Sequence, residues 1–213
     1  MTTPIRARRR AALGLLLCLS AAFAGCVNIG KGTPPRQPTY VLEPTAPPAQ
    51  LGPSGIALGV GPVTIPGYLN RNQMVSREAE NRLRIDPLHD WGAPLGEEIQ
   101  RVLGENLGRL LRSERVITWP WSRHADIVLR VPVQVLQFEP VAGKGVILVA
   151  RWQILSPEAT QVLLARQSEI IETLPGNSAD EHAAGMSRAL GSLALQIADA
   201  VRTSPAGAAA ANQ

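Results

Sequence analysis

Cysteine, histidine and aromatic residues are scarce in this chain of 213 residues. It holds two cysteines, three histidines and eight aromatic residues, namely four Trp, two Tyr and two Phe. Cys18 lies inside an apolar run near the amino terminus and Cys26 follows that run, so the rest of the chain has no thiol for a disulfide, a zinc site or a cysteine nucleophile. So few aromatic side chains also make a stacking platform for single-stranded nucleic acid improbable.

An excess of positive charge is also absent from the body of the chain. The formal net charge is +4, but Arg6, Arg8, Arg9 and Arg10 account for it, because the remaining 17 basic residues balance the 17 acidic ones. A neutral body without a basic run has no electrostatic footprint for a phosphate backbone, so we predict no nucleic-acid partner. The 45% of apolar residues suffices for a core, and the length suits one domain with tails.

Catalytic and cofactor motifs are missing too. Gly59-Val60-Gly61 is not followed by the residues of a phosphate loop or a dinucleotide fingerprint. His89, flanked by Asp86 and Asp90, could act as a general base or metal ligand, but turn formation or capping before a helix is the favoured interpretation. We therefore predict that the chain is not an enzyme and uses no cofactor and no metal.

Residues 1–25 have the three parts of an export signal. The arginines of Arg6–Arg10 precede an apolar run over Ala11–Ala24, and Gly25 leads to Cys26. The order Ala-Gly-Cys resembles the lipobox of bacterial lipoproteins, in which the cysteine is lipidated, for example with palmitate, and becomes the first mature residue. An ordinary signal peptide and an uncleaved anchor are the alternatives, although the run is shorter than the ~20 residues that span a bilayer. Val27, in place of the aspartate that commonly retains lipoproteins at the inner membrane, favours the outer membrane.

Residues 26–38 are predicted to form a proline-rich tether after Cys26. Seven prolines lie between Asn28 and Pro53, and proline favours the extended polyproline II conformation. At ~3.1 Å per residue, twelve such residues reach about 37 Å. The tether can therefore hold a folded domain away from lipid headgroups.

Residues 39–202 are predicted to form a single α+β domain. Apolar residues at helical spacing predict amphipathic helices over Pro94–Arg112 and Asp180–Arg202. Alternating or continuous apolar residues predict a sheet of about six strands, drawn from seven candidate segments: Ile56–Ile65, Gln73–Arg77 paired with Arg82–Asp86, Arg115–Thr118, Asp126–Phe138, Val146–Leu155 and Val162–Ile171. We expect a mainly antiparallel sheet with both helices on one face, and a disordered tail over 203–213.

Proline and glycine positions add two local expectations. Pro132 interrupts a strand, so that strand should lie at an edge or be bulged there, with Arg130 facing away from the apolar side. Gly96, Gly104 and Gly108 share one row of the first helix, which indicates close approach by a neighbour. Packing of this helix on the sheet is favoured over a subunit contact.

Two groups of residues are candidates for binding a partner. Tyr68, Arg71 and Gln73 belong to a turn between strands, where loops commonly carry function, although Tyr68 could instead cover the edge of the core. Trp119 and Trp121 could form an exposed binding edge, although packing over the end of the sheet is favoured.

A family resemblance spans about residues 38–202. The chain resembles the ABC-type transport auxiliary lipoproteins, the family of paraquat-inducible protein C. The residues that carry the resemblance are Tyr40-x-Leu42-x-Pro44, Leu58 to Val63, Pro66 to Arg71, Gln73 to Val75, Asn81 to Leu83, Trp91-x-x-Pro94-Leu95, Leu103-x-x-Asn106-Leu107 and the two tryptophans 119 and 121.

The resemblance implies an outer-membrane lipoprotein that faces the periplasm and supports membrane integrity. Its expected partner is an MCE-domain protein like paraquat-inducible protein B, which carries lipid across the periplasm together with an inner-membrane permease and ATPase. The implied role is non-catalytic docking of that system at the outer membrane, with a homo-oligomeric ring as one arrangement. A lipid-binding carrier with its own cavity and a structural or secretion-machinery lipoprotein are the alternatives.

Overall fold

A computed structural model describes residues 38–48, 55–122 and 125–210. The chain divides into two compact units, Met1–Arg36 and Gln37–Gln213, and all described residues belong to the second. The predicted signal peptide 1–25, the lipidation site Cys26, residues 26–37 of the tether, and His124 lie outside the described residues.

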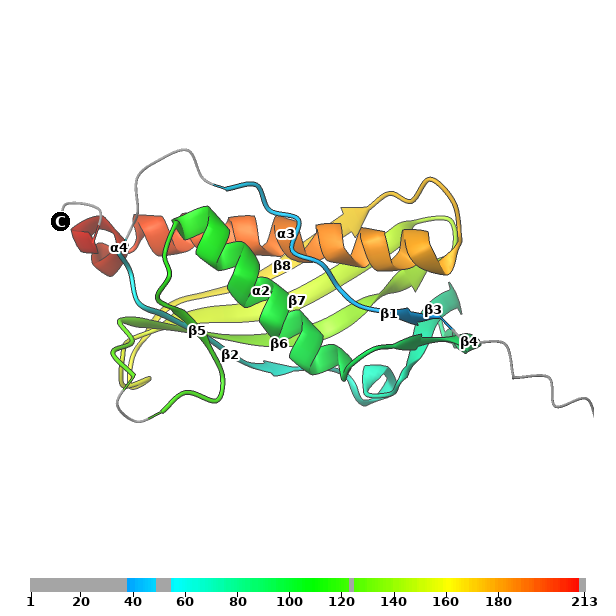
Figure 1. The fold of residues 1–213 in the computed structure, drawn as a ribbon, viewed down its shortest axis with the longest axis horizontal. Coiled ribbons are helices and arrows are strands. Elements are labelled where there is room, and N and C mark those ends of the chain that lie inside the picture. Colours follow the sequence, from blue (N-terminus) through cyan, green and yellow to red (C-terminus); the bar gives the residue numbers. More distant parts are fainter. Residues whose placement is uncertain (1–37, 49–54, 123–124, 211–213) are drawn as a thin grey trace, which may run out of the picture. The chain divides into compact units, whose positions relative to one another are not determined.

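The centre of the domain is an eight-stranded mixed sheet (Figure 1). Strand β6 bonds to β7 on one side and to β2 and β3 on the other. The pairs β3–β4, β6–β7 and β7–β8 are antiparallel, whereas β1–β4, β2–β5, β2–β6 and β3–β6 are parallel. The strands are β1 (Thr39–Tyr40), β2 (Leu58–Thr64), β3 (Gln73–Ala79), β4 (Arg82–Trp91), β5 (Val116–Thr118), β6 (Leu129–Val141), β7 (Gly145–Leu155) and β8 (Val162–Glu172).

The α+β class is confirmed, and the longest strand pairings, β6–β7 and β7–β8, are antiparallel as expected, although shorter parallel pairings make the sheet mixed. A helix between two strands returns the chain to the end where the first strand began, so the second strand runs parallel to the first. The chain leaves β2, forms the β3–β4 hairpin and then returns through helix α2 (Leu95–Leu111), which packs against both β2 and β5, so β5 can run parallel to β2.

Helices α2 and α3 (Ala179–Thr203) pack against each other on one face of the sheet (Figure 1). Their bounds agree within a residue with the predicted helices. Helix α3 begins with a capping box between Ser178 and Glu181, whereas α2 begins after Pro94 without a side-chain cap and has Glu97 and Glu98 in its first turn, near the positive end of the helix dipole. A short 3-10 helix, η1 (Gly67–Leu69), follows β2.

The core lies between the helix pair and the sheet. Leu103 and Leu107 of α2 are fully buried, as are Leu190 and Leu193 of α3. The alternating residues of β6 and β7 that face the helices are buried as well, namely Leu129, Val131, Val133, Val135, Val146, Leu148, Ala150, Trp152 and Ile154. The period-two pattern therefore predicted the covered face of these strands correctly.

Pro132 lies in the middle of the sheet, at a bulge. The register between β2 and β6 shifts between Val60 and Val63, which pair with Val131 and Val133, so two residues of β2 oppose Pro132. Because proline has no amide hydrogen to donate, the bulge removes the ladder bond that it could not make. Of the two expectations for this strand, the bulge is confirmed and the edge position is wrong.

Gly104 is the glycine of α2 at which a neighbour comes closest. A Cβ placed there would lie 2.7 Å from Cγ2 of Thr118 in β5, whereas at Gly96 the nearest atom, Cδ1 of Ile65, is 3.8 Å away. The close approach is thus made by a strand of the same domain, as expected for packing of a helix on the sheet.

Residues 40–47, here called the strap, precede both helices in the sequence and form hydrogen bonds to each of them. The Leu42 amide donates to Glu98 and its carbonyl accepts from Arg101, both in α2. The Glu43 amide donates to Ser187 Oγ in α3 at 3.0 Å, and the Ala46 amide donates to Asn106 Oδ1 in α2 at 2.8 Å. The strap is drawn in blue in Figure 1, where it crosses α3.

The carboxyl-terminal segment differs from the predicted disordered tail. Residues Pro205–Ala210 form a short helix, α4, which directly follows α3. Ser204 caps it, because its side-chain oxygen accepts from the Gly207 amide at 3.1 Å and its carbonyl accepts from the Ala208 amide at 2.9 Å. Alanine is the best helix former, so a capped alanine run needs no amphipathic pattern to be helical.

Candidate functional site

The loop that carries Tyr68 is tied to a buried carboxylate. The Tyr68 hydroxyl donates to Oε2 of Glu139 at 2.8 Å, and Arg77 Nε lies 2.7 Å from Oε1. Glu139 is fully buried and also accepts from the Gln137 side-chain amide and the Phe138 backbone amide. A buried carboxylate is stable only when paired and hydrogen-bonded, and these four donors provide that.

The same contacts determine the ionisation of the two side chains that hold Glu139. Burial and the hydrogen bond to Glu139 raise the pKa of Tyr68 well above its ordinary value, so its hydroxyl remains a donor. Burial is the largest single influence on Arg77 and lowers its pKa, but the hydrogen bonds and charge interactions with Glu139 and Tyr68 together outweigh burial and raise the pKa of the guanidinium. The cluster joins η1, β3 and β6 through hydrogen bonds and an ion pair, which is an arrangement suited to holding the fold.

Arg71 and Gln73 lie beside this cluster. Arg71 donates from Nε to the Tyr68 carbonyl at 2.9 Å and so braces the loop. Gln73 opens β3 and pairs with Asp90 of β4. Tyr68 is thus committed to contacts within the domain, while Arg71 and Gln73 are partly exposed at its edge.

Trp119 and Trp121 come together just after β5. Their rings meet edge to face with centroids 4.9 Å apart, and the Trp119 amide donates to the Val60 carbonyl of β2 at 2.9 Å. The carbonyl of Trp119 accepts from the side-chain amide of Gln100 in α2. Although the backbone of Trp119 is held on both sides, its side chain remains 45% exposed, which is a large apolar surface for one residue.

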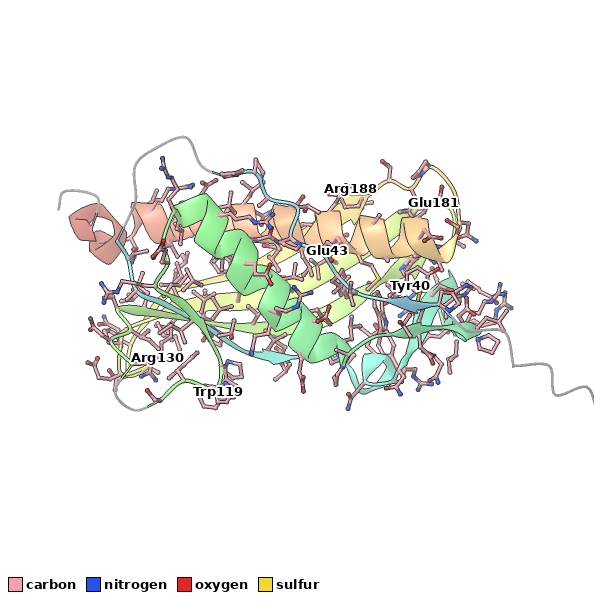
Figure 2. All side chains as sticks on the ribbon, in the orientation of Figure 1. Tyr40, Glu43, Trp119, Arg130, Glu181 and Arg188 are labelled. Atoms are coloured by element: carbon pink, nitrogen blue, oxygen red, sulfur yellow. The ribbon has the colours of Figure 1, made fainter. Side chains whose placement is uncertain are left out.

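Arg130 of β6 completes this group. Its guanidinium lies 5.4 Å from the centroid of the Trp121 ring, and its Nε is buried without a hydrogen-bond partner among the described residues. In the same part of the chain no carboxylate forms an ion pair with it. Figure 2 shows Arg130 and Trp119 at the same end of the sheet. We call Trp119, Trp121 and Arg130 the tryptophan surface.

Sequence reasoning identified the two tryptophans but not Arg130 as a member of this surface. The alternation of β6 places Arg130 on the side away from the helices, and Gly59 is its neighbour in β2. Because Gly59 has no side chain, the Trp121 ring can lie over it: a Cβ there would be 3.2 Å from that ring. The pairing of Gly59 with the outward-facing Arg130 would have indicated space for the Trp121 ring. This pairing could not be predicted, because the sequence does not show that β2 lies beside β6.

The two described histidines, His89 and His182, each contact one neighbouring polar side chain. His89 Nδ1 lies 2.8 Å from Asp86 Oδ2, and the other oxygen of Asp86 accepts from the Leu88 amide. His182 contacts Asn177 Oδ1, and burial lowers its pKa. Within residues 38–48, 55–122 and 125–210, no group of three or more His, Cys, Asp or Glu side chains could hold a metal ion. No helix in these ranges is long and apolar enough to cross a bilayer.

Comparison with known proteins gives one family and a shared fold. Residues 40–198 match the model of a family described as the ABC-type transport auxiliary lipoprotein component. The crystal structure of an uncharacterized protein has 20% sequence identity, covers 74% of this chain and 99% of its own, and has a TM-score of 0.61. A protein from Xanthomonas campestris has 14% identity, with 76% and 92% covered and a TM-score of 0.64. No curated protein matches the chain.

Proposed function

The chain belongs to the family of ABC-type transport auxiliary lipoprotein components, and from this premise we propose that it docks a lipid-transport system at the outer membrane without catalysis. The partner in this proposal is an MCE-domain protein that spans the periplasm, working with an inner-membrane permease and ATPase. The observation that carries the proposal is the family match over residues 40–198, which covers nearly the whole described domain.

The anchor of this proposal is a lipid on Cys26. The arginines of Arg6–Arg10, the apolar run and the Ala-Gly-Cys order support it, and Val27 supports the outer membrane. Cells labelled with a fatty acid such as palmitate should incorporate label into the wild type and not into Cys26→Ser. The labelled protein should co-sediment with outer-membrane vesicles. Equal labelling of both proteins, or sedimentation with inner-membrane vesicles, would contradict this part.

The tryptophan surface is our candidate for the partner contact. Tryptophan and arginine are among the residue types that most often dominate binding energy. Here the exposed indole of Trp119 contacts Trp121, whose ring lies against the Arg130 guanidinium, and Arg130 has no ion pair among the described residues. A partner segment with a carboxylate next to an apolar side chain would fit both groups. The loop at Tyr68, Arg71 and Gln73 is the weaker candidate, because the Tyr68 hydroxyl already binds Glu139.

Co-purification of the full chain with an MCE-domain protein of the same organism tests the docking role. Trp119→Ala and Arg130→Gln should each weaken binding by tenfold or more, as hot-spot substitutions do. Leu88→Ala is the matched control, because Leu88 is apolar and 59% exposed but lies on β4. Unchanged co-purification of folded Trp119→Ala and Arg130→Gln would exclude this surface, and failure of the wild type to co-purify would contradict the docking role itself.

A ring of identical subunits is the arrangement that we propose for docking. Among the described residues, β8 pairs with β7 and with no other strand, so it is an edge strand of the sheet, and its residues Val162, Leu163 and Ile171 are exposed. Such an edge favours association with a second copy. Sedimentation of the full chain should show a closed oligomer that Leu163→Lys disrupts, and a monomer at all concentrations would contradict the ring.

A further inference from the structure

A groove of about 740 Å³ lies between the strap and the outward face of α3. We propose that this strap groove binds a short segment of a partner protein in which lysine or arginine alternates with apolar side chains. The proposal does not depend on the transport role, and the groove shares no residue with the tryptophan surface.

The floor and walls of the strap groove are small or apolar. Helix α3 contributes Ala183, Ala184 and Gly191, and Leu195 lies at one end. Val41 of the strap is 48% exposed and Leu195 is 41% exposed, although both side chains face a concave surface. Apolar side chains left open in a concavity of this volume are typical of ligand sites, because the ligand removes them from water.

The charges around the strap groove select a cationic ligand. Among the described residues that line it, Glu43, Glu172 and Asp180 are acidic and Arg188 is basic. Arg188 Nε lies 3.5 Å from Glu172 Oε2, so these two charges compensate each other, and Ser192 donates to the other oxygen of Glu172.

Glu43 and Asp180 remain as two exposed carboxylates without an ion pair among the described residues. Figure 2 shows Glu43 and Arg188 beside α3, with Tyr40 toward its amino end. A net negative rim disfavours fatty acids, anionic phospholipids and acidic peptides, and favours a basic segment.

The strap, which forms one wall of the groove, is held in place by hydrogen bonds to α3. Ser187 accepts from the Glu43 amide at 3.0 Å, and the Thr45 hydroxyl donates to the Ser187 carbonyl at 3.3 Å. Gly191 lets the strap lie this close, because a Cβ there would be 2.4 Å from Thr45 Oγ1. A preformed groove needs little ordering when a ligand binds, so a short peptide can bind measurably.

The length of the groove sets the length of the probe. From Asp180 to Leu195, α3 rises about 22 Å at 1.5 Å per residue. An extended peptide covers that distance with about seven residues at 3.3 Å each. A nine-residue peptide of alternating leucine and lysine is therefore a suitable probe, and the same peptide with glutamate in place of lysine is its charge-reversed counterpart.

Fluorescence anisotropy of the labelled leucine–lysine peptide tests the proposal, with the full mature chain carrying Cys26→Ser as the receptor. We expect saturable binding that weakens as salt is raised. Glu43→Gln combined with Asp180→Asn should weaken binding about tenfold, since each lost pair is worth a few-fold. Ala184→Leu, which fills the exposed floor, should weaken it as well. Glu158→Gln combined with Glu169→Gln removes the same net charge elsewhere and should leave binding unchanged.

Several results would overturn the proposal. They are the absence of binding at millimolar peptide, equal binding of the charge-reversed peptide, or an equal loss in the Glu158/Glu169 control. Displacement of the peptide by oleate would instead assign the groove to a lipid chain. A dimer in sedimentation that Ala184→Leu abolishes would assign it to a second copy. Trp119→Ala should not affect peptide binding, so failure of the docking role and failure of this proposal can be told apart.

Discussion

The carboxylate of Glu139 is fully buried, and Tyr68 contributes to the stability of the domain by donating a hydrogen bond to it. Two of its four donors, Gln137 and Phe138, are neighbours on β6, but Tyr68 and Arg77 come from distant parts of the chain. The cluster therefore connects η1, β3 and β6 at the point where β3 joins the sheet, since Arg77 itself pairs with Val141.

We predict that Tyr68→Phe destabilises the domain by about 1–3 kcal/mol, because a buried carboxylate oxygen loses a donor. Tyr40→Phe is the matched control: it removes the same hydroxyl from a tyrosine whose hydroxyl forms no hydrogen bond with the described residues, so its effect should stay within about 0.5 kcal/mol. Urea unfolding of both variants measures the difference. Equal stability would mean that water replaces the hydroxyl at Glu139.

Glu98 makes the stability of the domain depend on pH. Its carboxylate binds Arg101 and accepts from the Leu42 amide at 3.1 Å. The Arg101 hydrogen bond lowers the pKa of Glu98 below the ordinary value of a glutamate, although burial acts in the opposite direction. The stabilisation from a lowered pKa is complete above the ordinary value and is lost as the pH falls through the folded value.

We therefore expect Glu98→Gln to be less stable than the wild type at pH 7, and the difference to shrink as the pH falls from about 5 to 3. Urea unfolding at several pH values measures this. A difference that stays constant over that range would show that Glu98 acts through packing alone.

At the scale of single elements, the glycine row of α2 gives a matched pair of substitutions. Gly104→Ala should cost about 1–3 kcal/mol, because its Cβ would lie 2.7 Å from Thr118 Cγ2 and the strand would have to move. Gly96→Ala should be neutral or stabilising by up to about 1 kcal/mol, since its nearest neighbour is 3.8 Å away and alanine is the better helix former. Thermal unfolding compares them, and equal midpoints would mean that β5 adjusts freely.

Helices were the elements most fully predicted from the sequence. A helix buries one face against whatever lies beneath it, so the spacing of Leu95, Ile99, Leu103 and Leu107 was enough to define α2. Strand faces were also predictable, but strand partners were not. Alternation places residues on a face and says nothing about order, so the parallel pairing of β2 with β6 could not be inferred.

Strand β4 was predicted too short. Its last part, Pro87 to Trp91, contains a proline and an aspartate, which favour a turn. It nevertheless continues as a strand because β1 pairs with it: Thr39 lies opposite Asp90 and Tyr40 opposite Trp91. That contact joins residues far apart in the sequence and overrides the local turn signal. The same limitation hid Glu139 as the partner of Tyr68, and Arg130 as the neighbour of Trp121.

At the scale of the whole molecule, the strap matters because it bonds to two helices that lie far from it in the sequence. Leu42 is fully buried, while Val41 beside it is 48% exposed. We predict that Leu42→Ala costs about 2–5 kcal/mol and Val41→Ala less than about 0.5 kcal/mol. Hydrogen exchange should accelerate in both α2 and α3 in Leu42→Ala, because the strap bonds to both. Faster exchange in one helix alone would show that the two helices respond independently.

The strap also determines how the domain would respond to a pull at its amino end. The chain enters the fold at Thr39 and Tyr40 in β1, and then passes along α2 and α3 with bonds to Glu98, Arg101, Asn106, Arg109 and Ser187. Several bonds to two helices, made within a few residues, resist tension together. A domain whose amino-terminal segment is fastened in this way is suited to bearing mechanical load. We expect single-molecule pulling from Pro38 to break the bonds of the strap in one step rather than one residue at a time.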